Sequence, residues 1–368
     1  MDDIGSGIRS VDNAIVRPSS AGEKMGIRQI CGVFQNNGQI VPKAMVLGRI
    51  GPLSMTGSCP DPSDLPHRQG RWLYGGIGFH HFGHALIFST ARLWALDHLD
   101  HSPDGIVFID RGVGNQTRVG TTRHLQAQLD FLGVELPVWT ISQPEVVETL
   151  LVPDQGISTH ASLFRGTDRY RQYIRRIIDK KAATSLYGDV YVSRRKLGFH
   201  KAGLMFEDRI QEGFAKAGYH IFHPQDHTLD HQINVYKSAR RIVTVDGSAL
   251  HLVAFAAQKD TRIGILSRRG FYADAFIDQI KAFSEAEAVA MKVYDTAYAP
   301  RSSFQDRSFE FKALCQTDFD RLAHQLITNG FLAENPGWKN PPLKRILKRL
   351  ERAGQKGRDT YAEIENPS

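Results

Sequence analysis

Short apolar runs alternate with helical segments through the second half of the chain, and this alternation restricts the fold more than any other feature. The runs that predict strands lie at 189–193, 219–222, 241–245 and 261–266. Strands and helices in this order form βαβ units, whose right-handed crossovers build a parallel sheet with helices on both faces. The sequence therefore predicts a doubly wound α/β domain over residues 185–335.

The first half predicts a second α/β domain with the same alternation. Its expected strands lie at 105–110, 136–141 and 145–152, and its expected helices at 83–99, 121–132 and 168–183. A glycine-rich turn is expected at 74–78, before the first of these helices. A chain of 368 residues is long enough for two domains of ordinary size. We expect a loose arm over 1–25, domains over 26–184 and 185–335, and a basic C-terminal segment over 336–368.

Composition narrows the classes of function without choosing one. The chain has 46 Lys and Arg residues against 39 Asp and Glu residues, for a net charge of +7. This balance suits a nucleic-acid binder, a protein at an anionic membrane, or an enzyme for phosphorylated substrates. The three cysteines lie far apart without a C-x-x-C pair, which excludes a zinc ribbon and a disulfide scaffold and favours a reducing cytoplasm. Because no signal-like start and no membrane-spanning apolar run occurs, we expect any membrane contact to be peripheral.

Three predicted strands of the second domain end in residues suited to a phosphorylated ligand. In a doubly wound sheet, ligands bind at the carboxyl ends of the strands, where helices begin. The segment Asp246–Leu250 joins a strand to a helix through small residues that let a phosphate approach the backbone, although such a turn is also an ordinary connector. Ser193–Arg195 brings two guanidinium groups to a strand end, either to hold phosphate oxygens or as a solvated pair. His223 follows a third strand, in a proline-containing loop that suits a flat nucleobase.

Three histidines cluster around the start of the helix expected at 83–99. The side chains of His80, His81 and His84 titrate near neutral pH, so one of them suits the role of general base for an attacking hydroxyl. A zinc site and a purely structural role are the alternatives that the spacing leaves open. The chain lacks a G-x-S-x-G elbow, a G-x-x-x-x-G-K-[ST] loop and an EF-hand pattern, which excludes the corresponding hydrolase, P-loop and calcium-sensor classes.

Five short motifs follow one another in a distinctive order. They are Phe82–Leu86 with Arg92–Leu96, then Tyr191–Arg195, Glu207, Gln232–Ile233 and Asp246–Leu250. In residue type and order these motifs resemble glycosyltransferase family 61, a group of GT-B-type inverting enzymes that includes bacterial polysaccharide-biosynthesis proteins. The chain departs from the family pattern at Phe206, Asp246 and Leu252, where the family has asparagine, histidine and asparagine.

The resemblance implies an α/β, GT-B-like fold with two Rossmann-like domains facing a cleft. Residues 26–184 would then form the acceptor-side domain and residues 185–335 the nucleotide-sugar domain. The implied donor-binding residues are Ser193, Arg194, Arg195, Glu207, His223, Gly247, Ser248, Ala249 and Leu250. The residues expected on the acceptor side are His80, His81 and Arg92, with His84 as general base and Asp110 and Asp246 as alternative catalytic groups. Because arginines and backbone N–H groups would hold the diphosphate, we expect no metal and no cofactor.

The C-terminal segment concentrates positive charge beside an apolar stripe. Residues 339–358 contain eight basic residues and one acidic residue. Leu343, Ile346, Leu347 and Leu350 share one face of a helix in this segment. This pattern is typical of a helix in an anionic membrane interface, and equally of a closing helix packed on the domains.

Together these features predict a cytoplasmic enzyme, peripheral at the inner membrane, that transfers a hexosyl or pentosyl group with inversion. The expected donor is a nucleotide sugar, UDP-linked, and the expected acceptor is a hydroxyl of a glycan or lipid-linked molecule in polysaccharide or capsule biosynthesis. We expect no nucleic-acid partner for such an enzyme. The alternative is a non-catalytic basic protein that binds RNA or anionic polysaccharide, and turnover of nucleotide sugars would separate the two.

Overall fold

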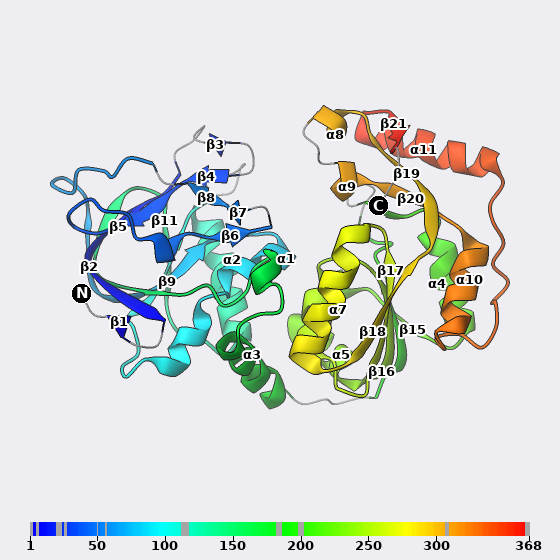
Figure 1. The fold of residues 1–368 in the computed structure, drawn as a ribbon, viewed down its shortest axis with the longest axis horizontal. Helices are drawn as coiled ribbons and strands as arrows, with labels where there is room; N and C mark the ends of the chain where they lie inside the picture. The colour runs from blue at the N-terminus through cyan, green and yellow to red at the C-terminus, as the bar shows by residue number, and fades with distance from the viewer. Residues whose placement is uncertain are drawn as a thin grey trace. The chain divides into compact units, whose positions relative to one another are not determined.

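The chain divides into two compact units, Met1–Lys180 (unit 1) and Lys181–Ser368 (unit 2), each of which contains parallel strands and helices (Figure 1). A mixed α/β architecture was expected and is confirmed. The computed structural model describes residues 3–4, 7–19, 24–25, 28–49, 51–55, 57–111, 118–181, 186–197, 202–305 and 309–364.

Unit 1 is built on a mixed sheet whose described strands follow the order β1-β2-β12-β9-β10-β11, with β5 paired to β2. These strands are β1 (Asp3–Ile4), β2 (Ile8–Arg17), β5 (Gly32–Phe34), β9 (His67–Ile77), β10 (Gly105–Ile109), β11 (Val138–Ile141) and β12 (Glu145–Pro153). Strands β12, β9, β10 and β11 are parallel, whereas β2 runs antiparallel to β12. Shorter strands are β3 (Lys24–Met25), β4 (Arg28–Ile30), β6 (Leu47–Gly48), β7 (Gly51–Pro52) and β8 (Ser54–Met55). The helices are α1 (Phe82–His84), α2 (Arg118–Phe131) and α3 (Asp168–Lys180), with 3₁₀ turns at Pro42–Ala44, Leu93–His98 and Ala161–Leu163.

Strand β2 corrects the expectation of a loose arm over residues 1–25. Ile8–Arg17 pair with β12 along almost its whole length. The strand buries Ile8 and Val11, and then Ala14–Val16 in succession. Asn13 has φ +46°, which shifts the alternation of buried residues midway along the strand. The period of two that reveals a strand in a sequence is therefore interrupted here.

Strand β9 includes the glycines that were expected to form a turn at 74–78. A Cβ on Gly75 would overlap the ring of Phe108 in β10, so the glycine lets the two strands pack closely. Gly76 has φ +96°, next to the point where the register between β9 and β10 shifts. These glycines thus shape a strand and do not end it.

The helix expected at 83–99 is divided into three short pieces. Between α1 and the 3₁₀ turn Leu93–His98 lies a π-helical turn over Ala85–Ser89. Thr90 Oγ1 donates to the Leu86 carbonyl at 2.6 Å, a side-chain bond that competes with continuation of the helix.

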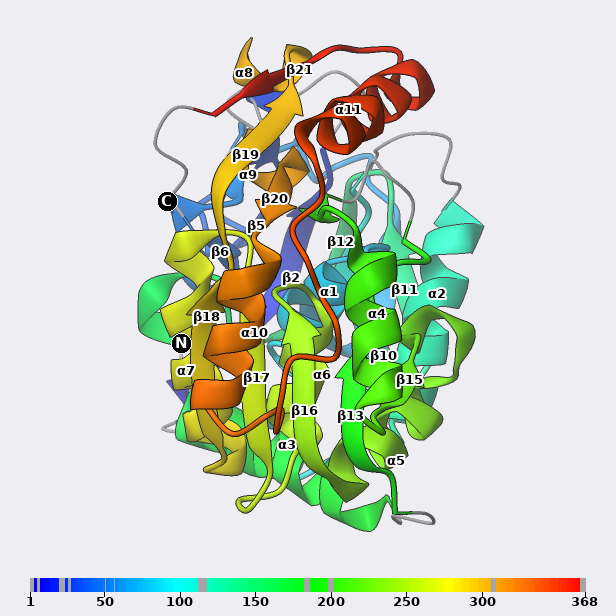
Figure 2. The same ribbon diagram turned by 90° about the vertical axis from the view of Figure 1, so that its right-hand side faces the viewer.

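Unit 2 contains the doubly wound sheet that the sequence predicts. Its described strands are parallel and follow the order β15-β13-β16-β17-β18. They are β13 (Gly188–Val192), β15 (His220–Phe222), β16 (Ala239–Val245), β17 (Arg262–Ser267) and β18 (Glu287–Lys292). The covering helices are α4 (Glu207–Lys216), α5 (Leu229–Ser238), α6 (Ala249–Ala256), α7 (Gly270–Ser284) and α10 (Phe319–Thr328). Figure 2 shows α4 and α10 on one face of this sheet and α5, α6 and α7 on the other.

An aromatic core joins α4 and α10 to the sheet. Tyr191 of β13 stacks on Phe214 of α4 with ring centroids 4.5 Å apart, and Trp338 meets Phe214 edge-on at 5.8 Å. Gly213 makes room for the indole, because a Cβ there would overlap Trp338. The segment that leads to the last helix is therefore fixed to the core of unit 2.

A second, smaller sheet in unit 2 has its described strands in the order β14-β20-β19-β21. Its elements, with the helices beside it, are β14 (Gly203–Leu204), β19 (Tyr294–Pro300), β20 (Leu314–Thr317), β21 (Tyr361–Glu363), α8 (Ser302–Gln305), α9 (Phe309–Lys312) and α11 (Leu343–Gly357). Strand β14 lies shortly before α4, which begins at Glu207. Helix α11 packs on this sheet through Ile346 and Ala353.

Candidate active site

The carboxyl ends of β13 and β16 mark the point in unit 2 where the order of strands reverses. The chain runs from β13 outward to β15, crosses back to β16, and continues through β17 to β18. The helices after β13 and β16, α4 and α6, therefore cover opposite faces of the sheet. Ligands of doubly wound proteins bind at such a reversal. The two segments predicted to hold phosphate, Ser193–Arg195 and Asp246–Leu250, follow these two strands directly.

Arg194 lies directly against Gly247 at this position. A Cβ on Gly247 would overlap Nη1 of Arg194, so the guanidinium covers the backbone of the glycine. Burial lowers the pKa of Arg194, and the carboxylates of Glu207 and Asp246 oppose that shift. This contact brings together two residues that are 53 positions apart in the chain.

Glu207 fixes the loop that carries Arg194. Its Oε1 accepts hydrogen bonds from the Arg194 backbone N–H at 2.6 Å and from the Tyr191 hydroxyl at 3.2 Å. Burial raises the pKa of Glu207, while its bond from the Arg194 N–H lowers it. The Ser193 hydroxyl donates to Gln211, one turn further along α4, at 3.0 Å. Glu207 and Ser193 were both predicted to bind the donor. Their side chains are buried, and in the structure they hold the loop that carries Arg194.

Two arginines that the sequence analysis missed extend this edge of the sheet. Arg268 and Arg269 follow β17, the neighbour of β16. Their backbone N–H groups donate to Asp246 Oδ2 at 2.9 and 3.0 Å, and the Arg269 Nε donates to Oδ1 at 3.0 Å. Arg194 was predicted because an arginine pair follows a predicted strand. Arg268 and Arg269 are also an arginine pair after a predicted strand.

The surroundings of Asp246 oppose its predicted role as an alternative general base. The side chain has no exposed surface. Burial by itself would raise the pKa of Asp246, but the charges of Arg269 and Arg268 outweigh burial and lower it. A carboxylate held in its ionised form by two guanidinium groups is a weak proton acceptor.

The remaining predicted donor residues differ in their access to a ligand. His223 follows β15, and its Nδ1 is buried without a hydrogen-bond partner among the described residues. Burial and the charge of Lys196 lower the pKa of His223. Ser248 precedes α6 and Ala249 begins it; within the first turn, the His251 backbone N–H already donates to the Ser248 carbonyl at 3.3 Å. The Leu250 side chain is fully buried and its backbone N–H donates to the Gly247 carbonyl at 3.0 Å; its contact with the donor stays a prediction.

The Arg195 side chain is exposed at the surface of the loop after β13. Its backbone N–H donates to the Ser193 hydroxyl at 3.2 Å, so the loop backbone is fixed while the guanidinium remains accessible to solvent.

In unit 1, the predicted histidines follow the carboxyl end of β9. His80 Nε2 lies 2.6 Å from Thr121 Oγ1, and its ring stacks on His124 at 5.3 Å. His84 ends α1, is exposed, and has its ring centroid 5.0 Å from that of His81, which is also exposed. His80 is thus tied to α2, whereas His81 and His84 present their rings at the surface of unit 1.

Asp110 follows β10, the parallel neighbour of β9, so it shares this edge of the unit 1 sheet with the histidines. Its backbone N–H donates to the Ile141 carbonyl at 2.9 Å, and its side chain is partly exposed. Asp110 therefore lies at the carboxyl end of a strand of unit 1, and its catalytic role stays a prediction.

The burial of Arg92 corrects the expectation of an acceptor contact. Its side chain has no exposed surface. Nε donates to the Pro153 carbonyl at 3.1 Å, and Nη2 donates to the carbonyls of Lys43 and Met45 at 3.1 and 2.9 Å. Arg92 therefore ties three segments of unit 1 together.

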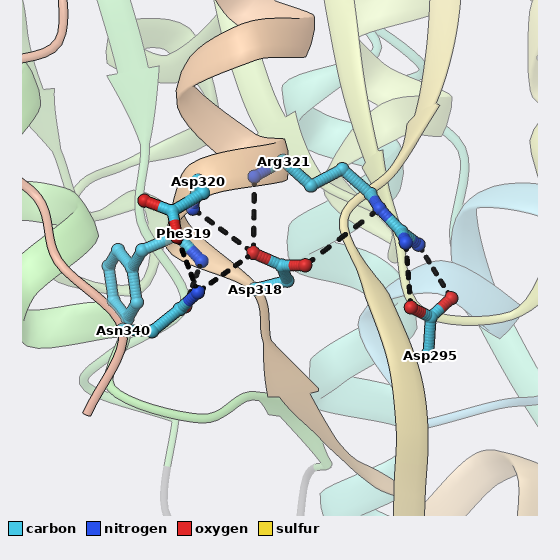
Figure 3. Close-up of polar contacts among 6 residues, drawn as sticks. All are labelled: Asp295, Asp318, Phe319, Asp320, Arg321 and Asn340. Carbon is cyan, nitrogen blue, oxygen red and sulfur yellow. Dashed lines mark hydrogen bonds and ion pairs between the residues drawn. The ribbon is translucent and has the colours of Figure 1, made fainter. Parts of the chain in front are cut away.

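The expectation of no metal also assumed that the chain has no Asp-x-Asp triplet, which is wrong, because one occurs at 318–320. Carboxylates at this spacing suit a divalent cation. Figure 3 shows them engaged otherwise: Asp318 Oδ1 accepts the backbone N–H groups of Asp320 and Arg321, each at 3.1 Å, at the start of α10. Asn340 binds both carboxylates, at 3.2 and 2.8 Å, and Arg321 pairs with Asp295 through two bonds of 2.6 Å. Within the described ranges, no three His, Cys, Asp or Glu side chains form a group that could hold a metal ion.

Helix α11 buries part of its predicted apolar stripe and exposes the rest. Ile346 is buried against unit 2, whereas Leu343 and Leu347 are 65% and 56% exposed. The predicted apolar stripe is thus divided between packing and solvent. In the part of the chain that the structure describes, no helix is long and apolar enough to cross a membrane.

Comparison with known proteins agrees with the motif order. The family model described as Glycosyltransferase 61 matches residues 79–264, which is just over half of the chain. No curated protein matches the chain. The matched range begins at the histidine cluster of unit 1, includes Arg194 and Gly247, and ends within β17, before Arg268. The chain therefore belongs to glycosyltransferase family 61.

Proposed function

We propose that this glycosyltransferase moves a hexosyl or pentosyl group from a UDP-linked sugar to a hydroxyl group of a glycan or lipid-linked acceptor, with inversion at the anomeric carbon. The observation that carries the proposal is the contact of Arg194 with Gly247 where the strand order of unit 2 reverses. A guanidinium beside the backbone N–H groups of a helix start is complementary to a diphosphate.

The chemistry requires stabilisation of the leaving group. As the bond between the sugar and the diphosphate breaks, negative charge grows on the phosphate oxygens. Arg194 is held by the Glu207 contact to its backbone, so little reorganisation is needed when that charge develops. Loss of one such prearranged donor costs about 3 kcal/mol in comparable sites.

The attack requires a base on the acceptor oxygen. His84 is our candidate, because its ring is exposed and neutral imidazole accepts a proton near pH 7. Asp110 is the second candidate, and the surroundings of Asp246 favour a different role for that residue. The proposal includes the GT-B-type organisation that the family implies, with unit 1 as the acceptor-side unit and unit 2 as the donor unit.

The proposed setting is polysaccharide biosynthesis on the cytoplasmic side of the inner membrane. Support for a membrane contact comes from α11, where exposed leucines lie among basic side chains. Such a helix binds anionic lipid through both apolar burial and charge. A peripheral contact of this kind would keep the enzyme near a lipid-linked acceptor.

A turnover assay with UDP-, GDP-, CDP- and ADP-linked sugars tests the proposal. We expect consumption of one donor class, and we expect Arg194→Ala to weaken nucleoside-diphosphate binding far more than nucleoside binding. Arg240→Ala is the control, because Arg240 is an exposed arginine at the opposite end of β16. Equal loss of diphosphate and nucleoside binding would show that Arg194 does not contact the phosphates. A chain that turns over no nucleotide sugar but binds RNA or anionic polysaccharide would instead be the non-catalytic binder.

A further inference from the structure

Arg268 and Arg269 share a single carboxylate at the carboxyl edge of the unit 2 sheet. Arg268 Nε lies 3.2 Å and Arg269 Nη2 lies 2.8 Å from Asp246 Oδ1. The two arginine side chains are 6% and 10% exposed. Two largely buried cations therefore face one buried anion, which leaves positive charge in excess.

One nitrogen of this group is positioned for a further acceptor. Nη1 of Arg268 is buried and makes no hydrogen bond with any described residue. A buried guanidinium nitrogen without a partner is costly, so its presence at a strand end points to function and not to stability. Arg269 is supported from its other side by the ring of Tyr272, with the guanidinium carbon 4.1 Å from the centroid.

The pair also interacts with the proposed phosphate-binding arginine. Burial and the charges of Arg269 and Arg194 together lower the pKa of Arg268 to about 9, against the opposing effect of Asp246. Arg194 lies against Gly247 and Arg268 binds Asp246, the preceding residue, so the two guanidinium groups approach the same turn. An anion bound there would relieve the repulsion on both sides.

Asp246 lies within the range that the family model matches, whereas the two arginines lie beyond it. Arg268 and Arg269 lie after residue 264, where the family match ends. An acid at 246 and arginines at 268 and 269 are mutually dependent, because each would be an unpaired buried charge without the other.

We propose that Arg268 and Arg269, positioned by Asp246, bind the phosphate groups of a nucleoside-diphosphate donor from the β17 side, opposite Arg194. The proposal rests on the proposed function for the identity of the donor. Asp246 is then a positioning residue that orients two guanidinium groups toward the phosphates. Free pyrophosphate has the same chemistry as the donor diphosphate, so binding of the two must be measured separately.

Arg269→Gln tests the proposal by calorimetry with UDP, uridine and pyrophosphate. We expect at least tenfold weaker binding of UDP and of pyrophosphate, with uridine binding unchanged. Arg269→Lys retains the charge but not the two-nitrogen geometry, and its affinity for UDP should lie between those of the wild type and Arg269→Gln. The matched control is Arg240→Gln, which removes an exposed arginine paired with Asp189 at the amino end of β16.

The outcomes separate this proposal from the proposed function. If the wild type binds UDP and Arg269→Gln binds it within twofold of the same affinity, the arginine proposal is overturned and the proposed function stands. If the wild type binds pyrophosphate but no nucleoside diphosphate, and Arg269→Gln binds pyrophosphate more weakly, the anion site stands and the donor assignment is overturned. Binding of none of these ligands by the wild type overturns both.

Asp246→Asn tests the positioning role. We expect the KM for the donor to rise and UDP affinity to fall at least tenfold, while uridine affinity and the pH profile of kcat are retained. Retained uridine binding also shows that unit 2 of the variant is folded. If Asp246→Asn does not bind uridine, the UDP affinity of Arg269→Lys tests the arginine site instead. An altered pH profile with an unchanged donor KM would make Asp246 the general base and overturn the positioning role.

Discussion

Gly247 is the residue whose missing side chain decides the geometry of the proposed donor site. Alanine at this position would overlap Nη1 of Arg194, and the guanidinium, as the end of a flexible side chain, would have to move. We expect Gly247→Ala to weaken UDP binding at least tenfold, with a change in unfolding free energy below about 1 kcal/mol. Calorimetry and urea unfolding provide the two measurements. Gly203→Ala is the control, since a Cβ there meets open space, and equal affinities for the two variants would contradict the proposed contact.

His84 is the residue on which the proposed acceptor chemistry depends. We expect His84→Ala to lower kcat at least ~10²-fold, the lower range for a general base, while the affinity for UDP stays unchanged. His101→Ala removes an exposed histidine elsewhere in unit 1 and is the matched control. Full activity of His84→Ala would transfer the role to Asp110.

At this scale the sequence predicts residues at strand ends well and buried polar residues poorly. The meeting of Arg194 with Gly247 follows from parallel strands, whose carboxyl ends share one edge of a sheet. Arg92 shows the converse, because a guanidinium that binds backbone carbonyls leaves no pattern in a sequence. Arg268 and Arg269 belong to none of the five motifs, although they follow a strand as Arg194 does.

A buried histidine of α6, His251, is hydrogen-bonded to α7, and from it we expect stability to depend on pH. Burial lowers the pKa of His251 to about 4, against a hydrogen bond with Gln279 of α7 at 2.7 Å that raises it. The unfolded chain takes up the proton near pH 6.5 and the folded chain only near pH 4. The unfolding free energy should therefore be unaffected by this group above pH 6.5 and decrease as the pH falls from 6.5 to 4, by about 3 kcal/mol in total.

Urea unfolding at pH 7 and pH 4.5 measures this effect. His251→Asn keeps a donor near the position of Nδ1 but does not titrate, so it should lose less stability between the two pH values than the wild type. The comparison cancels the contributions of other acidic groups. Equal losses in the two proteins would show that His251 does not keep a lowered pKa.

Helix α11 is the element on which the proposed membrane contact depends. Exposed Lys344 and Lys348 lie beside exposed Leu343 and Leu347. We expect the protein to co-sediment with liposomes that contain phosphatidylserine and not with neutral phosphatidylcholine, because each lysine contributes about 1 kcal/mol near an anionic surface. Added salt should release the protein, since it screens these charges.

The matched variants replace lysines by glutamine at two pairs of positions. Lys344→Gln with Lys348→Gln should abolish sedimentation, while Lys216→Gln with Lys259→Gln, exposed lysines outside α11, should not. Truncation is a poorer test, because Trp338 before the helix packs in the core of unit 2. Sedimentation of the α11 variant would locate the lipid contact elsewhere, and no sedimentation of the intact chain would leave α11 a packing role alone.

Elements with an uninterrupted period were predicted correctly, and those shaped by single special residues were not. All strands expected between 189 and 266 occur in the unit 2 sheet. In unit 1, Asn13 has a left-handed backbone that interrupts the alternation of β2. Gly75 and Gly76, which predicted a turn, lie within β9. The physical reason is that tertiary contacts, which a local pattern does not contain, decide the backbone at such positions.

For the whole molecule, the sequence predicted two α/β halves, but not the antiparallel strands that extend the sheet of unit 1. Strand β2 pairs with β12, more than 100 residues away in the chain, and β5 pairs in turn with β2. The parallel strands come from long, regular alternation and could be predicted. What decides the difference is whether an element carries its own period or acquires order from a distant partner.

The division into two units yields a prediction for the molecule as a whole. If donor binding belongs to unit 2, UDP should slow hydrogen exchange of backbone amides at 193–197, 246–250 and 268–269, because a bound ligand suppresses local opening. Amides at 80–84 in unit 1 should exchange at the same rate with and without UDP. Uridine is the control ligand, and it should leave 246–250 and 268–269 unchanged. Slower exchange at 80–84 with UDP alone would assign the histidines to donor binding, and unchanged exchange throughout unit 2 would move the donor away from the reversal of strand order.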